Sequence, residues 1–258
     1  MSAPEFPHTA PAANVQASAP VTELWKSLAE IRISGRTARK NRISAIEQSK
    51  LSAPYDVLRT RALRIMRENG WKTLAVTSPN KSCGKTTVSV NLAFSLARQA
   101  DLRIMLLDFD LRRPAMHRVL RHRPDHSLHN ALAGKVPVEK TLLRVGENLA
   151  FGLNAGPATN PSELLQAKAT RERIREIQAN FRPDILIFDM PPMLVSDENF
   201  GFLPQVDCGL LVGAADSTTL EQLDICEKDL ADLTNVLGVV LNKCRYAEAG
   251  AGYDYDYY

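Results

Sequence analysis

The apolar residues of the chain fall into short, nearly continuous runs and longer segments with helical spacing. A helical pattern near residues 55–69 ends at Asn69-Gly70, a pair typical of helix termini. Continuous apolar runs indicate strands that are covered on both faces. The pattern therefore predicts an α/β fold, a mostly parallel twisted sheet with helices on both faces. The expected strands are 73–78, 103–110, 148–153, 184–190, 208–214 and 236–242.

The first 50 residues do not follow this pattern. Residues 1–20 are rich in proline, alanine and serine, so we expect them to be disordered. A basic stretch follows, with no acidic residue from Ile31 to Ile43, which could bind anionic lipid or an acidic partner, or form a solvated linker. We expect a disordered, basic N-terminal extension over 1–50, a globular domain over 51–245 and a flexible, tyrosine-rich tail over 246–258.

Composition limits the cellular compartment and the classes of binding partner that we expect for this protein. The chain of 258 residues is 45% hydrophobic and 24% charged, which is typical of a globular protein. Its net charge of +3 is too small to indicate nucleic-acid binding. The four cysteines include no CxxC pair, and no apolar run reaches the roughly 18 residues that span a bilayer. We therefore expect a cytoplasmic protein that reaches the membrane only through a partner.

A candidate phosphate-binding loop, SPNKSCGKTT, follows the first predicted strand and opens a helix. Glycine lets the backbone approach phosphate oxygens, lysine neutralises them and the threonine hydroxyl binds magnesium. The match to G-x-x-x-x-G-K-[ST] is imperfect, because Pro79 replaces the first glycine and Ser82 stands where many such loops have another. We nevertheless predict a P-loop NTPase whose nucleotide contacts are Ser82, Cys83, Gly84, Lys85, Thr86 and Thr87.

Three carboxylates end predicted strands. Asp108 and Asp110 close the run MLLDFD, and Asp189 closes ILIFD. Ligands bind at the carboxyl ends of parallel strands, so all three should lie beside the loop. Magnesium prefers hard oxygen ligands, and the set therefore predicts an ATP–Mg²⁺ site with Thr86, Asp108 and Asp189 as the metal residues. The alternative is that these aspartates are buried or capping residues.

Together these segments resemble the bacterial tyrosine kinases, or BY-kinases, of capsule and exopolysaccharide synthesis, over about residues 50–258. The DxDxR motif with the terminal tyrosines is the specific part, because Walker A and B motifs alone would fit many nucleotide hydrolases. The matching segments are GKTTVSVNLA, MLLDFDLRRP, ILIFDMPP, NPSELL and GVVLNK.

The resemblance implies an ATP-dependent protein-tyrosine autokinase. By this resemblance, Asp108 and Asp110 lie in the family's second Walker motif, which supports metal binding and activates the tyrosine hydroxyl. Arg112 matches the arginine of that motif, which is placed to contact phosphate or acceptor, and Asn242 matches a residue that faces adenine in related folds. The implied catalytic residues are Lys85, Asp108, Asp110 and Arg112.

The resemblance also assigns a role to the tail. Its tyrosines look like the kinase's own phosphoacceptors, presented to the active site of a neighbouring molecule. Each phosphate would add negative charge beside Asp254 and Asp256, repel the tail from that site and so regulate assembly. A merely disordered aromatic end is the alternative. The predicted acceptors are Tyr253, Tyr255, Tyr257 and Tyr258.

The expected partner is a membrane polysaccharide co-polymerase, a chain-length regulator, whose cytoplasmic tail completes the nucleotide site. Such a partner would hold this stand-alone kinase subunit at the inner membrane. The ring-forming motif E-x-x-R-x-x-R aligns with Ala53, Asp56 and Arg59, so only its last arginine is kept. Formation of a homo-oligomer is still an alternative, but the altered motif argues against a ring formed through it.

Two other functions fit part of the pattern. The first is a septum-site or partition ATPase, which works as a nucleotide-dependent dimer. The signature lysine of that class would fall on Asn80, and its members lack a terminal tyrosine cluster. The second is a regulator that binds ATP without transferring phosphate, which the altered loop and first-helix motif leave open.

Overall fold

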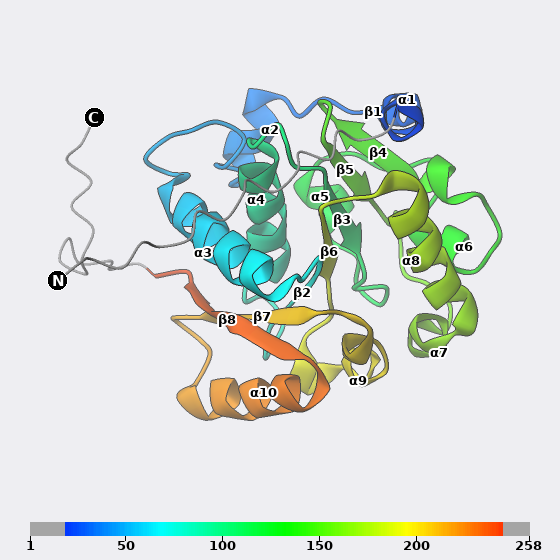
Figure 1. The fold of residues 1–258 in the computed structure, drawn as a ribbon. Helices are drawn as coiled ribbons and strands as arrows, with labels where there is room; N and C mark the ends of the chain where they lie inside the picture. Colours follow the sequence, from blue (N-terminus) through cyan, green and yellow to red (C-terminus); the bar gives the residue numbers. More distant parts are fainter. Residues whose placement is uncertain (1–18, 245–258) are drawn as a thin grey trace, which may run out of the picture.

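One eight-stranded sheet runs through the centre of the protein (Figure 1). The computed structural model describes residues 19–244. The strand order is β1-β4-β5-β3-β6-β2-β7-β8, in which β4 pairs antiparallel with β5 and all other neighbours are parallel. The strands are β1 Ala29–Glu30, β2 Thr73–Thr77, β3 Ile104–Asp108, β4 Leu142–Val145, β5 Leu149–Gly152, β6 Ile185–Asp189, β7 Cys208–Ala214 and β8 Asn235–Asn242.

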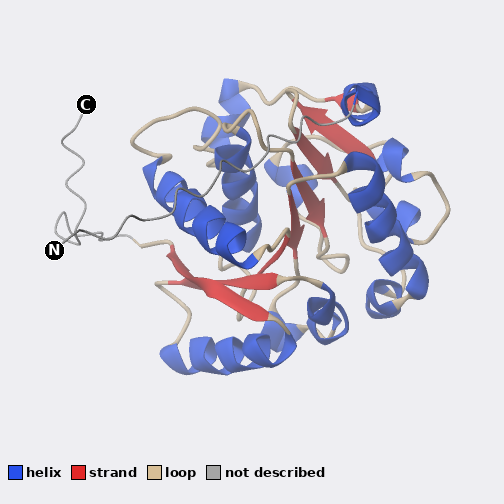
Figure 2. Ribbon diagram, in the orientation of Figure 1, coloured by secondary structure: helices blue, strands red, loops and turns tan. Residues whose placement is uncertain are grey.

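Helices cover both faces of the sheet (Figure 2). Alternate residues of the central strands enter different cores: Leu74 and Val76 pack beneath α3 and α4, whereas Ala75 packs beneath α8, α9 and α10. The α/β prediction with helices on both faces is therefore confirmed. The helices are α1 Ala19–Ser27, α2 Gly35–Lys40, α3 Ala53–Asn69, α4 Lys85–Ala97, α5 Met116–Val119, α6 Leu128–Leu132, α7 Pro161–Gln166, α8 Lys168–Phe181, α9 Glu198–Phe202 and α10 Leu220–Leu233.

All six predicted strands are present, as β2, β3, β5, β6, β7 and β8. The predicted first helix is α3, and it ends at Gly70, whose φ of 70° is readily available only to glycine. The prediction missed β1 and β4. Both are short and lie next to each other at one edge of the sheet. The two residues of β1 are exposed and only the first two residues of β4 are buried, so neither strand forms a long apolar run.

The N-terminal boundary at residue 50 was wrong for the described part of that segment. The indole of Trp25 is 1% exposed, donates a hydrogen bond to the carbonyl oxygen of Phe181 at 2.7 Å, and packs edge-on against its ring. Ile31 and Ile43 enter the core on the other face of the sheet. Residues 19–50 therefore belong to the folded domain, because a few apolar anchors in a basic segment suffice to dock it. Residues 1–18 and the tail at 246–258 lie outside the described residues.

The buried Asn91 of α4 fastens the segment before α3 to the domain. Its Oδ1 accepts hydrogen bonds from the amides of Ser44 at 2.8 Å and Ala45 at 3.0 Å. Its Nδ2 donates to the carbonyl oxygens of Arg42 at 2.9 Å and Thr87 at 2.8 Å. One side chain thus joins the loop 42–45 to the first turn of α4.

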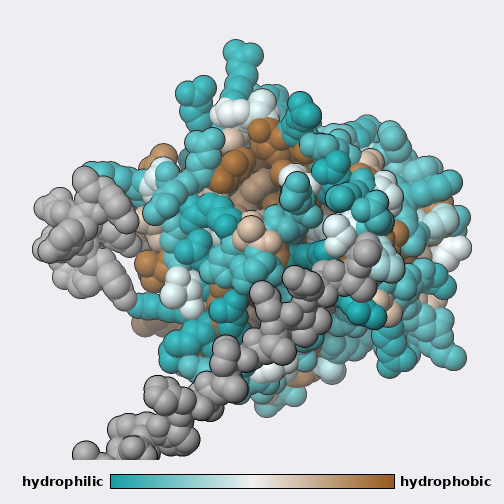
Figure 3. Space-filling view, turned by 45° about the horizontal axis from the view of Figure 1, so that its top comes forward, coloured by the Kyte–Doolittle hydropathy of each residue, from teal (hydrophilic) through white to brown (hydrophobic). Residues whose placement is uncertain are grey.

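The face of the molecule seen in Figure 3 is mainly hydrophilic, and its most extensive group of apolar side chains lies in a recess framed by polar side chains. Among residues 19–244, no helix has both the length and the apolar character needed to cross a membrane.

Candidate active site

The predicted phosphate-binding loop connects β2 to α4, as its position after a strand required. Gly84 has a φ of 90°, and a Cβ atom there would lie 2.2 Å from Nδ2 of Asn242. That same nitrogen donates a hydrogen bond to the carbonyl oxygen of Cys83 at 2.9 Å. Only glycine therefore fits at position 84, and Asn242, at the end of β8, fixes the loop backbone.

Ser82 explains how the loop tolerates its departure from the glycine pattern. Its φ is 63°, the left-handed conformation for which glycine is favoured, and it is exposed. Serine adopts this conformation at some energetic cost, so the loop keeps a glycine-like path without a glycine. Cys83 is buried, with its sulfur 3.6 Å from the Thr218 hydroxyl. Thr87 is half-buried in the first turn of α4.

Lys85 meets the predicted carboxylates. Its ammonium nitrogen lies 2.9 Å from Oδ2 of Asp110 and 3.9 Å from Oδ1 of Asp189. Burial alone would lower the pKa of Lys85, but the charges of Asp189, Asp110 and Asp108 outweigh it, and the pKa is raised. Lys85 is therefore held as a cation in an interior site, where it can neutralise anionic oxygens.

Asp108 and Asp189 are paired across neighbouring parallel strands β3 and β6, and both are fully buried. Asp108 accepts a hydrogen bond from the amide of Met116 at 3.3 Å, and Asp189 accepts one from the hydroxyl of Ser89 at 3.1 Å. Burial raises the pKa of Asp108 well above its usual range, and Asp189 raises it further. Burial also raises the pKa of Asp189, against the opposing effects of Lys85 and of Thr86 and Ser89.

Two carboxylate oxygens in this site lack a partner among the described residues. They are Oδ1 of Asp108 and Oδ2 of Asp189, and both are buried. Buried polar atoms in native proteins nearly always have a partner, so such atoms indicate a site for water or a cation. Thr86 lies beside them at the start of α4, where free backbone amides favour anions. The residues present therefore fit a magnesium ion together with phosphate.

Arg112 is engaged elsewhere. Its Nε donates to Glu198 at 2.7 Å, and its terminal nitrogen donates to Ser162 at 3.2 Å and Asp197 at 3.3 Å. The hydrogen bond that Arg112 donates to Glu198 raises the pKa of Arg112. Among the predicted residues, the structure thus brings together Lys85, Thr86, Asp108, Asp110 and Asp189, and it pairs Arg112 with acids instead. The contact of Arg112 with phosphate or acceptor stays a prediction.

Ser89 and Asn154 were missed by the sequence analysis. Asn154, two residues after β5, donates to the carbonyl oxygen of Asp108 at 2.8 Å and accepts from the amide of His129 at 2.9 Å. Ser89 lies one helical turn after Lys85, and that spacing on a predicted helix could have identified it. Asn154 follows a different strand from the one that Asp108 ends, so no local pattern could have connected the two residues.

The positions aligned with the ring-forming motif make contacts within the chain. Asp56 pairs with Arg98 and with Arg59, and the hydroxyl of Ser95 donates to it at 2.7 Å. These side chains join α3 to α4. The four predicted phosphoacceptors, Tyr253, Tyr255, Tyr257 and Tyr258, lie outside the described residues.

Residues 74–254 match the CobQ/CobB/MinD/ParA nucleotide binding domain family. Among curated proteins, the chain is 29% identical over 227 residues to the tyrosine-protein kinase YwqD of Bacillus subtilis, covering 87% of this chain and 93% of that protein. It is 31% identical over 175 residues to the tyrosine-protein kinase CpsD of Streptococcus pneumoniae, covering 67% of this chain and 76% of CpsD.

Solved structures give the same result. The kinase domain of the Escherichia coli tyrosine kinase ETK aligns with a TM-score of 0.70 and 27% identity, covering 90% of this chain and 89% of that one. The MinD protein of Pyrococcus horikoshii, at a TM-score of 0.55 and 20% identity, shares the fold. The nucleotide-binding fold, the loop with its three carboxylates and these similarities agree, and the chain belongs to the bacterial tyrosine-protein kinases.

Proposed function

We propose that this protein is an ATP-dependent tyrosine autokinase that transfers the γ-phosphate of ATP to tyrosines of its own tail. The observation that carries the proposal is the buried pair of Lys85 and Asp110, 2.9 Å apart, beside Asp108 and Asp189. A cation for phosphate oxygens and a carboxylate for a hydroxyl proton are the two groups that phosphoryl transfer to tyrosine requires.

Binding of ATP would rearrange this pair. The backbone amides at the start of α4 and the Lys85 ammonium would bind the phosphates, and Lys85 would exchange Asp110 for phosphate oxygens. The exchange frees a carboxylate oxygen of Asp110. Asp110 is then available to an incoming hydroxyl group.

In the transfer step, the phenolic oxygen of a tyrosine forms a bond to the γ-phosphorus while the bond from that phosphorus to the bridging oxygen of ADP breaks. The phenol has an ordinary pKa of about 10, so its proton must leave during the reaction. Asp110 accepts that proton, and Lys85 offsets the charge that builds up on the phosphate oxygens.

Thr86, Asp108 and Asp189 would hold magnesium. Asp108 and Asp189 each have a buried carboxylate oxygen without a hydrogen-bond partner among the described residues, and these oxygens would bind the ion. When bound, the ion supplies charge neutralisation on the β- and γ-phosphate oxygens. Ser89 orients Asp189 through its hydrogen bond, which leaves the second oxygen of Asp189 directed to other partners.

The proposed acceptors are Tyr253, Tyr255, Tyr257 and Tyr258, and the proposed process is the polymerisation and export of capsule or exopolysaccharide. A membrane co-polymerase would activate the kinase and hold it at the membrane from the cytoplasmic side. These steps rest on membership of the family and on the tyrosine cluster in the sequence.

The test is mass-spectrometric mapping of phosphotyrosine after incubation of the full chain with Mg-ATP, with and without candidate co-polymerase tails. Phosphate on Tyr253 to Tyr258 that is absent from Lys85→Ala and from Asp110→Asn supports the autokinase. ATP hydrolysis without phosphotyrosine under every condition would favour an ATPase of the septum-site and partition type. ATP binding without either reaction would favour a regulator.

A further inference from the structure

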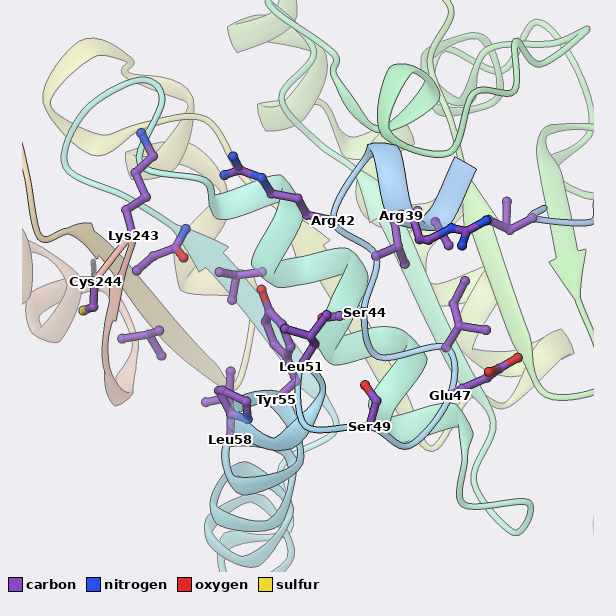
Figure 4. Close-up of a pocket in the computed structure, with 18 of the residues that line it drawn as sticks. Arg39, Arg42, Ser44, Glu47, Ser49, Leu51, Tyr55, Leu58, Lys243 and Cys244 are labelled. Atoms are coloured by element: carbon purple, nitrogen blue, oxygen red, sulfur yellow. The ribbon is translucent and has the colours of Figure 1, made fainter. Parts of the chain in front are cut away.

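A large cavity lies apart from Lys85 and the three aspartates. Its volume is about 970 Å³, within the range of ligand pockets. The helix α2, the segment 41–52, the start of α3 and the end of β8 enclose it (Figure 4). None of the residues that form the Lys85 cluster lines it. Asn242 does line it, and the same side chain bonds to the carbonyl oxygen of Cys83, so the cavity adjoins the phosphate-binding loop without including the Lys85 cluster.

The wall of the cavity is apolar, and part of it is left uncovered. Ile46, Tyr55, Leu58 and Val240 contribute to the wall, and Leu51 lies over it. Leu51 is 77% exposed and Leu241, also a lining residue, is 55% exposed. Aliphatic side chains grouped in this way at a hollow favour an apolar or aromatic occupant.

The charged residues of the cavity are mostly basic. Arg39, Arg42 and Lys243 line it, against a single acid, Glu47. Arg42 and Lys243 reach toward the same end, away from Glu47 (Figure 4). Within residues 19–244, none of these three cations forms an ion pair. The occupant that fits is therefore both aromatic and acidic.

The chain itself supplies such a segment at this place. Lys243 and Cys244 are lining residues and the last that the structure describes, so the described chain ends at the cavity. The tail at 246–258 carries five tyrosines, with Asp254 and Asp256 between the last of them. At roughly 3.3–3.6 Å per residue, the fully extended segment would span about 45 Å, which is long enough to fold back onto a cavity at its own base. Tethering also gives it a millimolar effective concentration at the cavity.

The geometry points to a docking site in this cavity for the tyrosine tail of the same molecule, with the rings against the apolar wall and the aspartates toward Arg42 and Lys243. This site is separate from the Lys85 cluster. If the tail is also the phosphoacceptor, as the proposed function holds, docking withdraws it from the active site of a second molecule. The docking itself requires no catalysis.

The experiment places a nitroxide on the full chain at Gly252→Cys in a Cys244→Ser background. The other three cysteines are buried and should not react. Amide signals of Ile46 and Leu51 report on the cavity, and that of Leu132 reports on the opposite face of the sheet. The disrupting variant is Arg42→Glu with Lys243→Glu. The matched control is Lys168→Glu with Arg175→Glu, two exposed positions of α8.

Docking within one molecule predicts that the amide signals of Ile46 and Leu51 lose intensity and that the signal of Leu132 does not. The loss should be unchanged on tenfold dilution. The loss should disappear in the Arg42→Glu, Lys243→Glu variant and persist in the control. Full intensity at the cavity would overturn the proposal. Intensity loss that weakens on dilution would show docking between molecules and would also overturn it, as would loss that survives the charge reversal. Because no outcome depends on phosphate transfer, failure here is distinguishable from failure of the proposed function.

Discussion

The ammonium group of Lys85 lies 2.9 Å from a carboxylate oxygen of Asp110, and both side chains are buried. One residue comes from the start of α4 and the other from the loop after β3. The pair joins the group that binds phosphate to the group proposed to accept the tyrosine proton. The two roles can be separated by substitution.

Asp110→Asn should lower the rate of tyrosine phosphorylation more than it lowers affinity for Mg-ATP. Loss of a positioned base typically costs about 10²–10⁴-fold in rate. Single-turnover phosphorylation and calorimetric ATP binding measure the two effects. Asp101→Asn, at an exposed loop position, is the control and should match the native protein. An equal loss of rate and affinity would assign Asp110 to nucleotide binding alone.

Ser89→Ala should raise the magnesium concentration needed for half-maximal activity by about 10–100-fold, as is typical when a partner of a metal ligand is removed. The reason is the 3.1 Å hydrogen bond from Ser89 to Asp189. Titration with magnesium at saturating ATP measures the change. Ser95→Ala provides the comparison, since Ser95 is buried in the same helix but bonds to Asp56. An unchanged magnesium dependence in Ser89→Ala contradicts the positioning role.

Asp108→Asn should flatten the pH dependence of stability in the ligand-free protein. Burial raises the pKa of Asp108 above the ordinary value of 3.8, so the folded state binds this proton more tightly than the unfolded chain. The free energy of unfolding therefore falls as the pH rises from about 3.8 through the raised pKa. Thermal melting between pH 5 and 8 should show a smaller fall in Tm for Asp108→Asn. The control is Asp125→Asn, at an exposed position. If Tm falls as steeply in Asp108→Asn as in this control, Asp108 is not the source of the pH dependence.

Trp25→Ala should destabilise the domain by about 3–5 kcal/mol, the usual cost of truncating a buried tryptophan. The indole is 1% exposed and its nitrogen bonds to Phe181. Urea unfolding measures the loss. Trp71→Phe, at a half-buried position, should cost far less. A change below about 1 kcal/mol for Trp25→Ala would return residues 19–50 to the status of an extension.

The sequence predicted what depends on local pattern. Continuous apolar runs located six of the eight strands of residues 19–244, and the rule that ligands bind at the carboxyl edge of a parallel sheet correctly placed Asp108 beside Asp189. Prediction from the sequence failed where contacts are made between segments that are distant along the chain. Trp25 docks on Phe181, 156 positions away, and Arg112 pairs with Glu198, 86 positions away. No local window contains both partners, so the sequence analysis assigned residues 1–50 to an extension and Arg112 to phosphate or acceptor.

The hydrogen bonds of Asn91 connect the proposed phosphate-binding site with the large cavity. One amide group holds both the Thr87 carbonyl, two residues after Lys85, and the backbone of the loop 42–45 that borders the large cavity. Any shift of the first turn of α4 would therefore be transmitted to that loop through these hydrogen bonds. Thermodynamic reciprocity then requires that any occupant of the cavity changes nucleotide affinity by the same factor by which nucleotide changes the affinity of the occupant.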